Sequence, residues 1–176
     1  PMSVQILADQ GADVIKIEQP DGGDSCRQMG AKRGGMSSMF AVLNRNKRSM
    51  VLDLKQDAAQ DIVRKLVTES DVLVQNFRPG AMQRIGLDYA QVQALNPGLV
   101  YASISGFGAD GPYANRRVYD PVIQAISGFV GTQKISGSQS LDLIKNIVCD
   151  KVTALTAAQA ITAALFVRER SGAGQH

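Results

Sequence analysis

Short apolar runs and amphipathic segments follow one another along this chain, and the pattern predicts strands separated by helices. Apolar residues recur at helical spacing over residues 1–10 and 57–69. Four apolar runs bounded by turn residues are typical of strands, and they occupy residues 13–18, 49–54, 72–74 and 99–105. Strands joined by helical crossovers pair in parallel with right-handed connections. We therefore expect an α/β fold, with a Rossmann-like, mostly parallel sheet and helices on both faces.

Capping residues predict where further helices begin. Asp88 is a favoured cap for a helix that runs to Leu95, after a short helix over 81–85. Asp120, followed by a proline, should begin a helix that runs to about residue 129. Asp150 should cap a long, alanine-rich helix over 151–170. In the helix over 57–69, one stripe is expected to face the core and comprises Ile62, Val63, Leu66 and Val67.

Glycine-rich stretches interrupt the periodic segments. Residues 19–35 contain five glycines without periodicity, so we expect a long loop, and such loops in compact domains are usually functional or mobile. Residues 106–117 follow a predicted strand with three glycines and a proline, and 131–140 is a polar Gly/Ser loop. The cationic segment 44–48 is typical of a solvated turn.

Composition and charge narrow the class of protein. The chain has 176 residues, which favours one domain. Its net charge of +3 is spread along the sequence without the aromatic interleaving of a single-strand binder, so no nucleic-acid partner is expected. No apolar run approaches a membrane span and no signal peptide is visible. Cys26 and Cys149 fit no metal or redox spacing, so we expect a reduced, cytoplasmic protein without a metal site.

The stretch over 71–86 is the strongest candidate for a ligand site. A short apolar run there meets a polar turn and then a helical pattern, which places the turn at the carboxyl edge of a sheet, where open α/β folds bind ligands. Arg78 and Arg84 converge at this edge with exposed backbone N–H groups, which favours a phosphate-bearing ligand. An ordinary loop with solvated arginines is the alternative. The later glycine loop is not a GxGxxG motif, so a dinucleotide fingerprint is absent.

Asp150 permits two interpretations, a helix cap or a nucleophile. As a helix cap it contributes roughly 1 kcal/mol to stability. The same position also keeps a carboxylate ionised beside the positive end of the helix dipole, and an ionised carboxylate can attack an acyl group. The spacing of residues leaves both readings open.

Several motifs, in fixed order and nearly end to end, resemble the family III CoA-transferases. They are GADVIKIE, LNRNKRSMVLDLK, SDVLVQNFRPGAMQRIGLDY, LNPGLVYASISGFGADGPY and VCDKVTALTAAQAITAAL. This CaiB–BaiF group includes formyl-CoA transferases and α-methylacyl-CoA racemases. The resemblance implies a Rossmann-like large domain and a small domain, with two chains interlocked as a homodimer. Because the chain starts within a helical pattern and stops before an expected strand, we expect residues 1–176 to be a fragment of the large CoA-binding domain, without the small domain and inactive alone.

The resemblance also assigns roles to individual residues. It makes Asp150 the catalytic aspartate and places Tyr119 near the thioester. Gln19 stands where some members have an arginine, which departs from the pattern at one CoA contact. The implied CoA-binding residues are Lys55, Asn76, Phe77, Arg84 and Arg117.

The implied reaction moves CoA between an acyl-CoA thioester and a carboxylic acid, with CoA as a co-substrate and no permanently bound cofactor. Asp150 would form an acyl-aspartyl anhydride and then an aspartyl-CoA thioester, and backbone N–H groups at the helix start could stabilise an oxyanion. Cys149, the preceding residue, is interpreted as a small buried side chain.

Two alternatives remain. A 2-methylacyl-CoA racemase of the same family would carry a histidine at Tyr119, whereas the single histidine here is His176. A non-catalytic CoA- or nucleotide-binding module would keep the basic strand ends without needing Asp150. The sequence does not indicate the acyl donor or acceptor.

Overall fold

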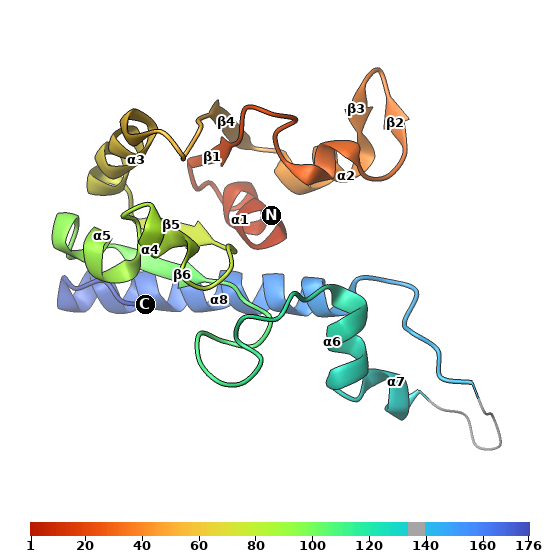
Figure 1. The fold of residues 1–176 in the computed structure, drawn as a ribbon. Coiled ribbons are helices and arrows are strands. Elements are labelled where there is room, and N and C mark those ends of the chain that lie inside the picture. The colour runs from red at the N-terminus through yellow and green to blue at the C-terminus, as the bar shows by residue number, and fades with distance from the viewer. Residues whose placement is uncertain (134–139) are drawn as a thin grey trace.

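The fold is seen in a computed structural model that describes residues 1–133 and 140–176 (Figure 1). The helices are α1 (Met2–Asp9), the 3-10 helix η1 (Ser25–Gln28), α2 (Ser38–Asn44), α3 (Asp57–Glu69), α4 (Ala81–Arg84), α5 (Tyr89–Leu95), α6 (Asp120–Ile126), α7 (Phe129–Thr132) and α8 (Val148–Ser171). The strands are β1 (Val14–Glu18), β2 (Lys32–Arg33), β3 (Met36–Ser37), β4 (Lys47–Val51), β5 (Val72–Gln75) and β6 (Val100–Ser103). Residues 134–139 of the predicted Gly/Ser loop lie outside the described residues.

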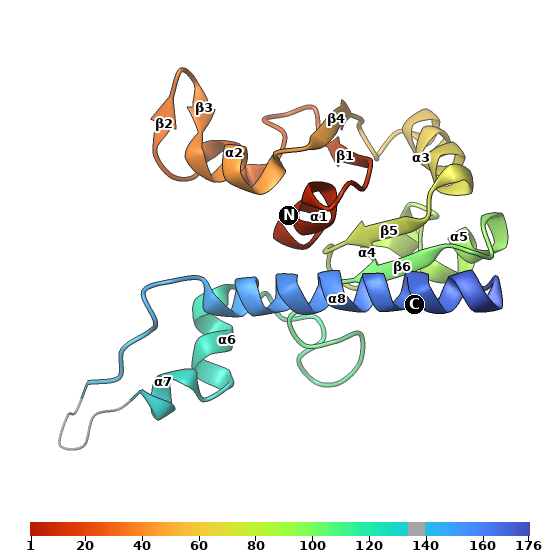
Figure 2. The same cartoon turned by 180° about the vertical axis from the view of Figure 1, so that it is seen from behind.

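Parallel pairing between strands that are distant in sequence confirms the α/β class. β1 pairs with β4, with Val14 opposite Lys47, and β5 pairs with β6, with Val72 opposite Val100. In the described part of the chain these pairs form two separate parallel sheets, and β2 and β3 form an antiparallel hairpin. Both views show α8 running along the β5–β6 pair and α1 lying between α8 and the β1–β4 pair (Figures 1 and 2).

The apolar core holds the β5–β6 pair against α3 and α5. Tyr101 is buried there, and its hydroxyl donates to the carbonyl oxygen of Leu87 at 2.9 Å. Burial raises the pKa of Tyr101 to about 12, so the hydroxyl stays a donor. In the predicted stripe on α3, Val63 and Val67 are buried as expected. The prediction is wrong for Ile62, whose exposed fraction is 41%. The core comprises Val63, Val67, Met82, Leu87, Val92, Leu99 and Tyr101.

A polar network orders much of the predicted long loop. The carboxylate of Glu18, at the end of β1, is 1% exposed and accepts from Arg27 Nε and Nη2 at 2.8 Å each. The backbone N–H of Asp24 and the hydroxyl of Ser49 donate to the same carboxylate at 2.8 and 2.7 Å. Residues 19–35 are therefore not one structureless loop, because these bonds and the β2–β3 hairpin give them fixed contacts.

The cationic segment 44–48 is a turn only in its middle, because Asn44 ends α2 and Lys47 begins β4. Arg45 and Arg48 are exposed, as predicted. Arg45 pairs with Asp9, and Arg48 pairs with Asp13 at 2.5 Å. Lys47 donates to three protein oxygens, and burial, with nearby Lys16, lowers its pKa to about 8.

The second predicted strand also starts and ends earlier than expected. β4 begins at Lys47 rather than Ser49, because Asn46 turns the chain with a left-handed φ of 61° immediately after α2. β4 ends at Val51, and Leu52 and Leu54 pack against the core beyond it. A strand that carries paired cations lacks the apolar pattern by which strands are recognised.

No helix in the described residues is both long enough and apolar enough to cross a membrane.

Candidate active site at the start of helix α8

Asp150 lies inside α8 and does not cap it. The helix begins at Val148, and Ile147 is the residue that precedes it. The first helical hydrogen bond runs from the Lys151 N–H to the carbonyl oxygen of Ile147 at 3.1 Å, so Asp150 lies within the first turn. The prediction that Asp150 is the cap is therefore wrong, and Asp150 occupies the first turn as an exposed side chain.

The capping acceptor comes instead from α6. Asp120 is 5% exposed, and its Oδ2 accepts from the backbone N–H of Asp150 at 3.0 Å. Asp120 was expected to cap its own helix, but Tyr119 precedes α6 and Asp120 is its first residue. A carboxylate from one helix thus satisfies an N–H group in the first turn of another. Both views show the two helices meeting at this point (Figures 1 and 2).

Gln124 extends this contact to the segment that leads into α8. It is 1% exposed, and its amide donates to Asp120 Oδ1 and, at 2.9 Å, to the carbonyl oxygen of Asn146. Its Oε1 accepts from the Ile144 N–H at 2.8 Å. The sequence pattern did not predict this role of Gln124. The available signal was the four-residue spacing of Asp120 and Gln124, which places both on one face of a helix.

The surroundings of Asp150 favour a basic carboxylate. Partial desolvation raises its pKa, and the neighbouring charge of Asp120 raises it further. The helix dipole is therefore not the dominant influence on this pKa, because desolvation and the like charge of Asp120 act in the opposite direction. The Asp150 carboxylate accepts no hydrogen bond and forms no ion pair within the described residues, so it is free to react.

Cys149 is buried, as predicted, at 7% exposure. Burial raises the pKa of its thiol, and Asp120 and Asp150 add to that effect. A thiol held protonated in this way is a poor nucleophile.

The helix-start N–H groups offer less to an oxyanion than expected. Those of Val148, Asp150 and Lys151 already donate to Asn146, Asp120 and Ile147.

Tyr119 shares this end of the molecule with Asp150. It directly precedes Asp120, which contacts the Asp150 backbone. Its side chain is 73% exposed, so its ring faces solvent rather than the core.

The predicted CoA-binding residues lie at or after the carboxyl ends of strands. Asn76 and Phe77 directly follow β5, and Phe77 is 53% exposed. The ends of β5 and β6 are aligned, because Gln75 lies opposite Ser103 and donates to its hydroxyl at 2.9 Å. Lys55 follows β4 and is exposed.

Gly80 shapes the turn after β5. It adopts a left-handed φ of 76°, and Arg84 Nη1 lies 3.3 Å from the position that a Cβ would occupy there. Arg84 therefore lies over the turn that follows β5, as the sequence pattern predicts.

Three of the predicted CoA-binding residues are cations without a partner among the described residues. Lys55, Arg84 and Arg117 are exposed, and none of their side chains donates a hydrogen bond or forms an ion pair within the described residues. The described contacts do not join any of them to Asp150. Other arginines have carboxylate partners, and these are Arg27, Arg45, Arg48, Arg64 and Arg168.

Gln19 is occupied by its own loop. Its amide donates to the carbonyl oxygens of Asp21 and Gly23 at 3.1 and 3.3 Å.

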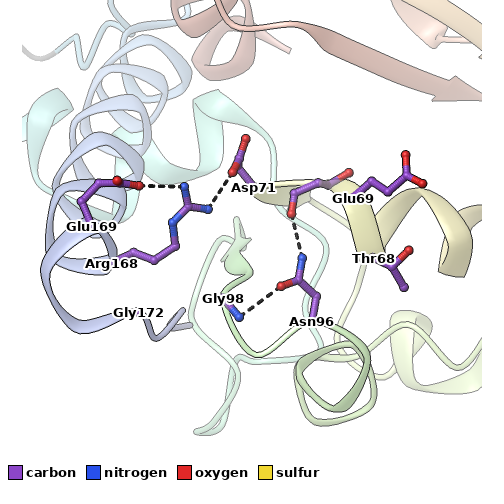
Figure 3. A pocket seen from close by; sticks show the side chains of 9 residues that line it. Thr68, Glu69, Asp71, Asn96, Gly98, Arg168, Glu169 and Gly172 are labelled. Atoms are coloured by element: carbon purple, nitrogen blue, oxygen red, sulfur yellow. Dashed lines mark hydrogen bonds and ion pairs between the residues drawn. The ribbon is translucent and has the colours of Figure 1, made fainter.

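A cavity of about 480 Å³ lies away from this site, and Figure 3 shows its lining. It is at the amino ends of β5 and β6, beside the last turn of α8. Arg168 there bonds Asp71 at 2.8 Å, and the Asn96 amide donates to the carbonyl oxygens of Val67 and Ser70 at 2.9 Å each. The Arg168–Asp71 pair joins α8 to the start of β5, and the Asn96 bonds join the ends of α3 and α5. Among the described residues no cluster of three or more His, Cys, Asp or Glu could hold a metal ion.

Comparison with known proteins gives a consistent result. The model of the family described as CoA-transferase family III matches residues 1–176. A succinate–glutarate CoA-transferase of Agrobacterium fabrum is 42% identical, with 100% of this chain and 46% of the relative covered. An acetyl-CoA:oxalate CoA-transferase of Acetobacter aceti is 39% identical, covering 100% and 45%. The crystal structure of a CAIB/BAIF family protein from Brucella suis superposes with a TM-score of 0.93 at 40% identity, covering 100% and 47%. The chain spans about half the length of the curated relatives it matches.

Proposed function

Because this chain belongs to CoA-transferase family III, we propose that the whole protein transfers CoA between an acyl-CoA thioester and a carboxylic acid. The observation that carries the proposal is Asp150, an exposed carboxylate in the first turn of α8. Its backbone is held by a buried second carboxylate, while its own oxygens have no partner within the described residues. This combination of a fixed backbone and a free side chain suits a nucleophile.

In the first step, an Asp150 oxygen attacks the carbonyl carbon of the donor thioester. The C–S bond breaks, the sulfur keeps the electron pair, and CoA leaves as a thiolate. The product is a mixed anhydride between Asp150 and the donor acyl group.

In the second step, the thiolate attacks the carboxyl carbon of Asp150 in the anhydride. The donor acid leaves as a carboxylate, and an aspartyl-CoA thioester remains. The acceptor carboxylate then attacks that thioester and releases the thiolate, which finally attacks the acceptor acyl carbon and regenerates Asp150. The exchange uses no external proton or redox partner.

Binding of CoA is assigned to the strand ends. The unpaired cations Lys55, Arg84 and Arg117 are suited to the CoA phosphates. The exposed Phe77 ring and Asn76 offer a stacking surface and an amide at the same edge. We place Tyr119 near the thioester, because it adjoins the residue that holds Asp150.

The racemase alternative is weaker. His176 bonds the Ser103 hydroxyl at 2.8 Å and stacks on Tyr89 with ring centroids 5.1 Å apart, so it belongs to the β6 end rather than to α8. Tyr119 stands in place of the histidine that such a proton transfer uses as its base. The small domain, the interlocked homodimer and the cytoplasmic location stay predictions from the family resemblance.

The decisive experiment replaces the nucleophile in the whole protein. Asp150→Asn keeps the size of the side chain and removes its attacking oxygen anion, so CoA exchange should fall by at least about a thousandfold. Succinate, glutarate and oxalate are the first acceptors to test, because the named relatives act on them. Exchange is followed by chromatographic separation of the acyl-CoA esters.

The matched control is Asp57→Asn, which alters an exposed aspartate in the first turn of α3 and should leave exchange unchanged. Hydroxylamine should trap an Asp150 hydroxamate from the wild-type protein mixed with acyl-CoA. An Asp150→Asn variant with full exchange would refute the proposal, and so would the absence of trapped hydroxamate during rapid exchange.

A further inference from the structure

Asp120 is a buried carboxylate without a cationic partner. It is 5% exposed, and it forms no ion pair within the described residues. Both oxygens instead accept amide N–H groups, Oδ2 from the Asp150 backbone at 3.0 Å and Oδ1 from Gln124. Burying a charge without a counter-ion is costly. A purely structural connection between α6 and α8 could be made by a neutral side chain, so the carboxylate calls for a further explanation.

The contacts of Asp120 converge on the candidate nucleophile. Asp120 holds the backbone of Asp150 itself, and Gln124 holds Ile144 and Asn146 in the segment that leads into α8. One face of α6 thus holds both the first turn of α8 and the segment that leads into it. The Asp150 side chain has no hydrogen bond of its own within the described residues, so the direction in which it points depends on its backbone.

We infer that Asp120 is a positioning residue for the reaction of Asp150: its carboxylate fixes the first turn of α8 and, with it, the direction of attack on the acyl carbon. The inference rests on the proposed function. A misplacement of about 1 Å in a reacting group can cost roughly a hundredfold in rate. Asp120 is too buried to touch substrate, so it acts only through Asp150.

Charge gives Asp120 a second effect on the same group. The titratable groups that face Asp150 are Asp120 on α6 and the adjacent Cys149 thiol. The charge of Asp120 adds to desolvation in raising the pKa of Asp150. Removing the charge of Asp120 should therefore lower the pKa of Asp150 and extend activity to more acidic pH.

The test uses steady-state CoA exchange by the whole protein. In Asp120→Asn, one amide oxygen must replace two acceptors, so either the Asp150 N–H or the Gln124 amide faces another donor. We expect kcat to fall at least about tenfold, the KM for acyl-CoA to stay within about twofold, and the acidic limb of the kcat–pH profile to move to lower pH.

Two further variants separate position from charge. Gln124→Met removes the amide contacts and leaves the Asp120 charge, so kcat should fall while the acidic limb stays in place. Ser127→Ala is the matched control on the same helix, because its hydroxyl donates only to the Gln124 carbonyl oxygen at 3.3 Å, and it should change neither quantity.

The outcomes are distinct. A folded Asp120→Asn protein whose kcat changes less than about twofold and whose acidic limb does not move would overturn the inference. If that variant does not fold, an unchanged kcat in Gln124→Met overturns it equally. In both cases the proposed function stands if the wild type exchanges CoA and the Asp150→Asn variant does not. A wild-type protein that exchanges no CoA would refute the proposed function and this inference together.

Discussion

The buried carboxylate of Glu18 should make a large, pH-dependent contribution to stability. Its hydrogen bonds from Arg27 outweigh burial and hold its pKa at about 2, compared with the ordinary 4.5. That difference corresponds to about 3 kcal/mol of stabilisation at neutral pH. The side chain is 1% exposed, so solvent screens this interaction weakly.

Glu18→Gln removes the charge and keeps the shape. We expect the free energy of unfolding to fall by about 3 kcal/mol at neutral pH. Because the folded-state pKa is depressed, the stabilisation is complete above the ordinary value and is lost as the pH falls toward about 2. The gap between wild type and variant should therefore narrow, with less than half remaining at about pH 3.

Urea unfolding of the whole protein, followed by circular dichroism across this pH range, measures the gap. Glu69→Gln is the matched control, because this exposed glutamate ends α3 without a hydrogen bond or ion pair in the described part of the chain, and it should change stability by less than about 0.5 kcal/mol. A Glu18→Gln loss below about 1 kcal/mol at neutral pH, or a gap that stays constant as the pH falls, would show that the Arg27 pair does not stabilise the fold as argued.

Three further predictions concern the loop, the ligand and the reaction. Gly23→Ala should destabilise the protein by about 1–3 kcal/mol, because its Cβ would lie 2.5 Å from a Glu18 oxygen. Gly22→Ala, which has open space around the new Cβ, should reduce stability less in the same urea titration. Equal losses of stability in the two variants would contradict the contact argument. Arg84→Ala should weaken CoA binding by about 1.5–3 kcal/mol in isothermal titration, whereas the exposed Lys65→Ala should not; unchanged affinity for Arg84→Ala would make that arginine a surface charge. Tyr119 stands where a racemase of this family would carry its histidine base. A 2-methylacyl-CoA in heavy water should therefore gain no α-deuterium, and rapid α-deuteration would contradict the transferase assignment.

Local sequence was sufficient where a segment depends on its near neighbours. The amphipathic period predicted α3 over residues 57–69, and the structure has the same bounds. Asp88 caps α5 as expected, with the reciprocal bond from Gln91 completing a capping box. The alternation of strands and helices also predicted parallel pairing, which β1–β4 and β5–β6 confirm.

Local sequence misled where polar groups are satisfied by distant partners. The exposed cations of segment 44–48 carried no signal for their partners, but Arg45 and Arg48 pair with carboxylates in α1 and just before β1. The glycines of 19–35 indicated a structureless loop, but the Glu18–Arg27 contacts order part of it. In each case the partner is too far along the chain for periodicity or propensity to indicate the pair.

In the candidate site, too, some features follow from local sequence and others depend on tertiary contacts. By itself the sequence determined the helix that carries Asp150 and the cations at the strand ends, and it indicated the candidate reactive groups, because these follow from composition, spacing and family resemblance. Only the tertiary structure decided that α8 begins before Asp150, that Asp120 supplies the acceptor for its N–H, and that Arg84 is unpaired while Arg27 is bound. The physical reason is that capping, burial and charge pairing depend on which elements meet in space, and α6 meets α8 across thirty residues of chain, as the Asp120–Asp150 bond shows.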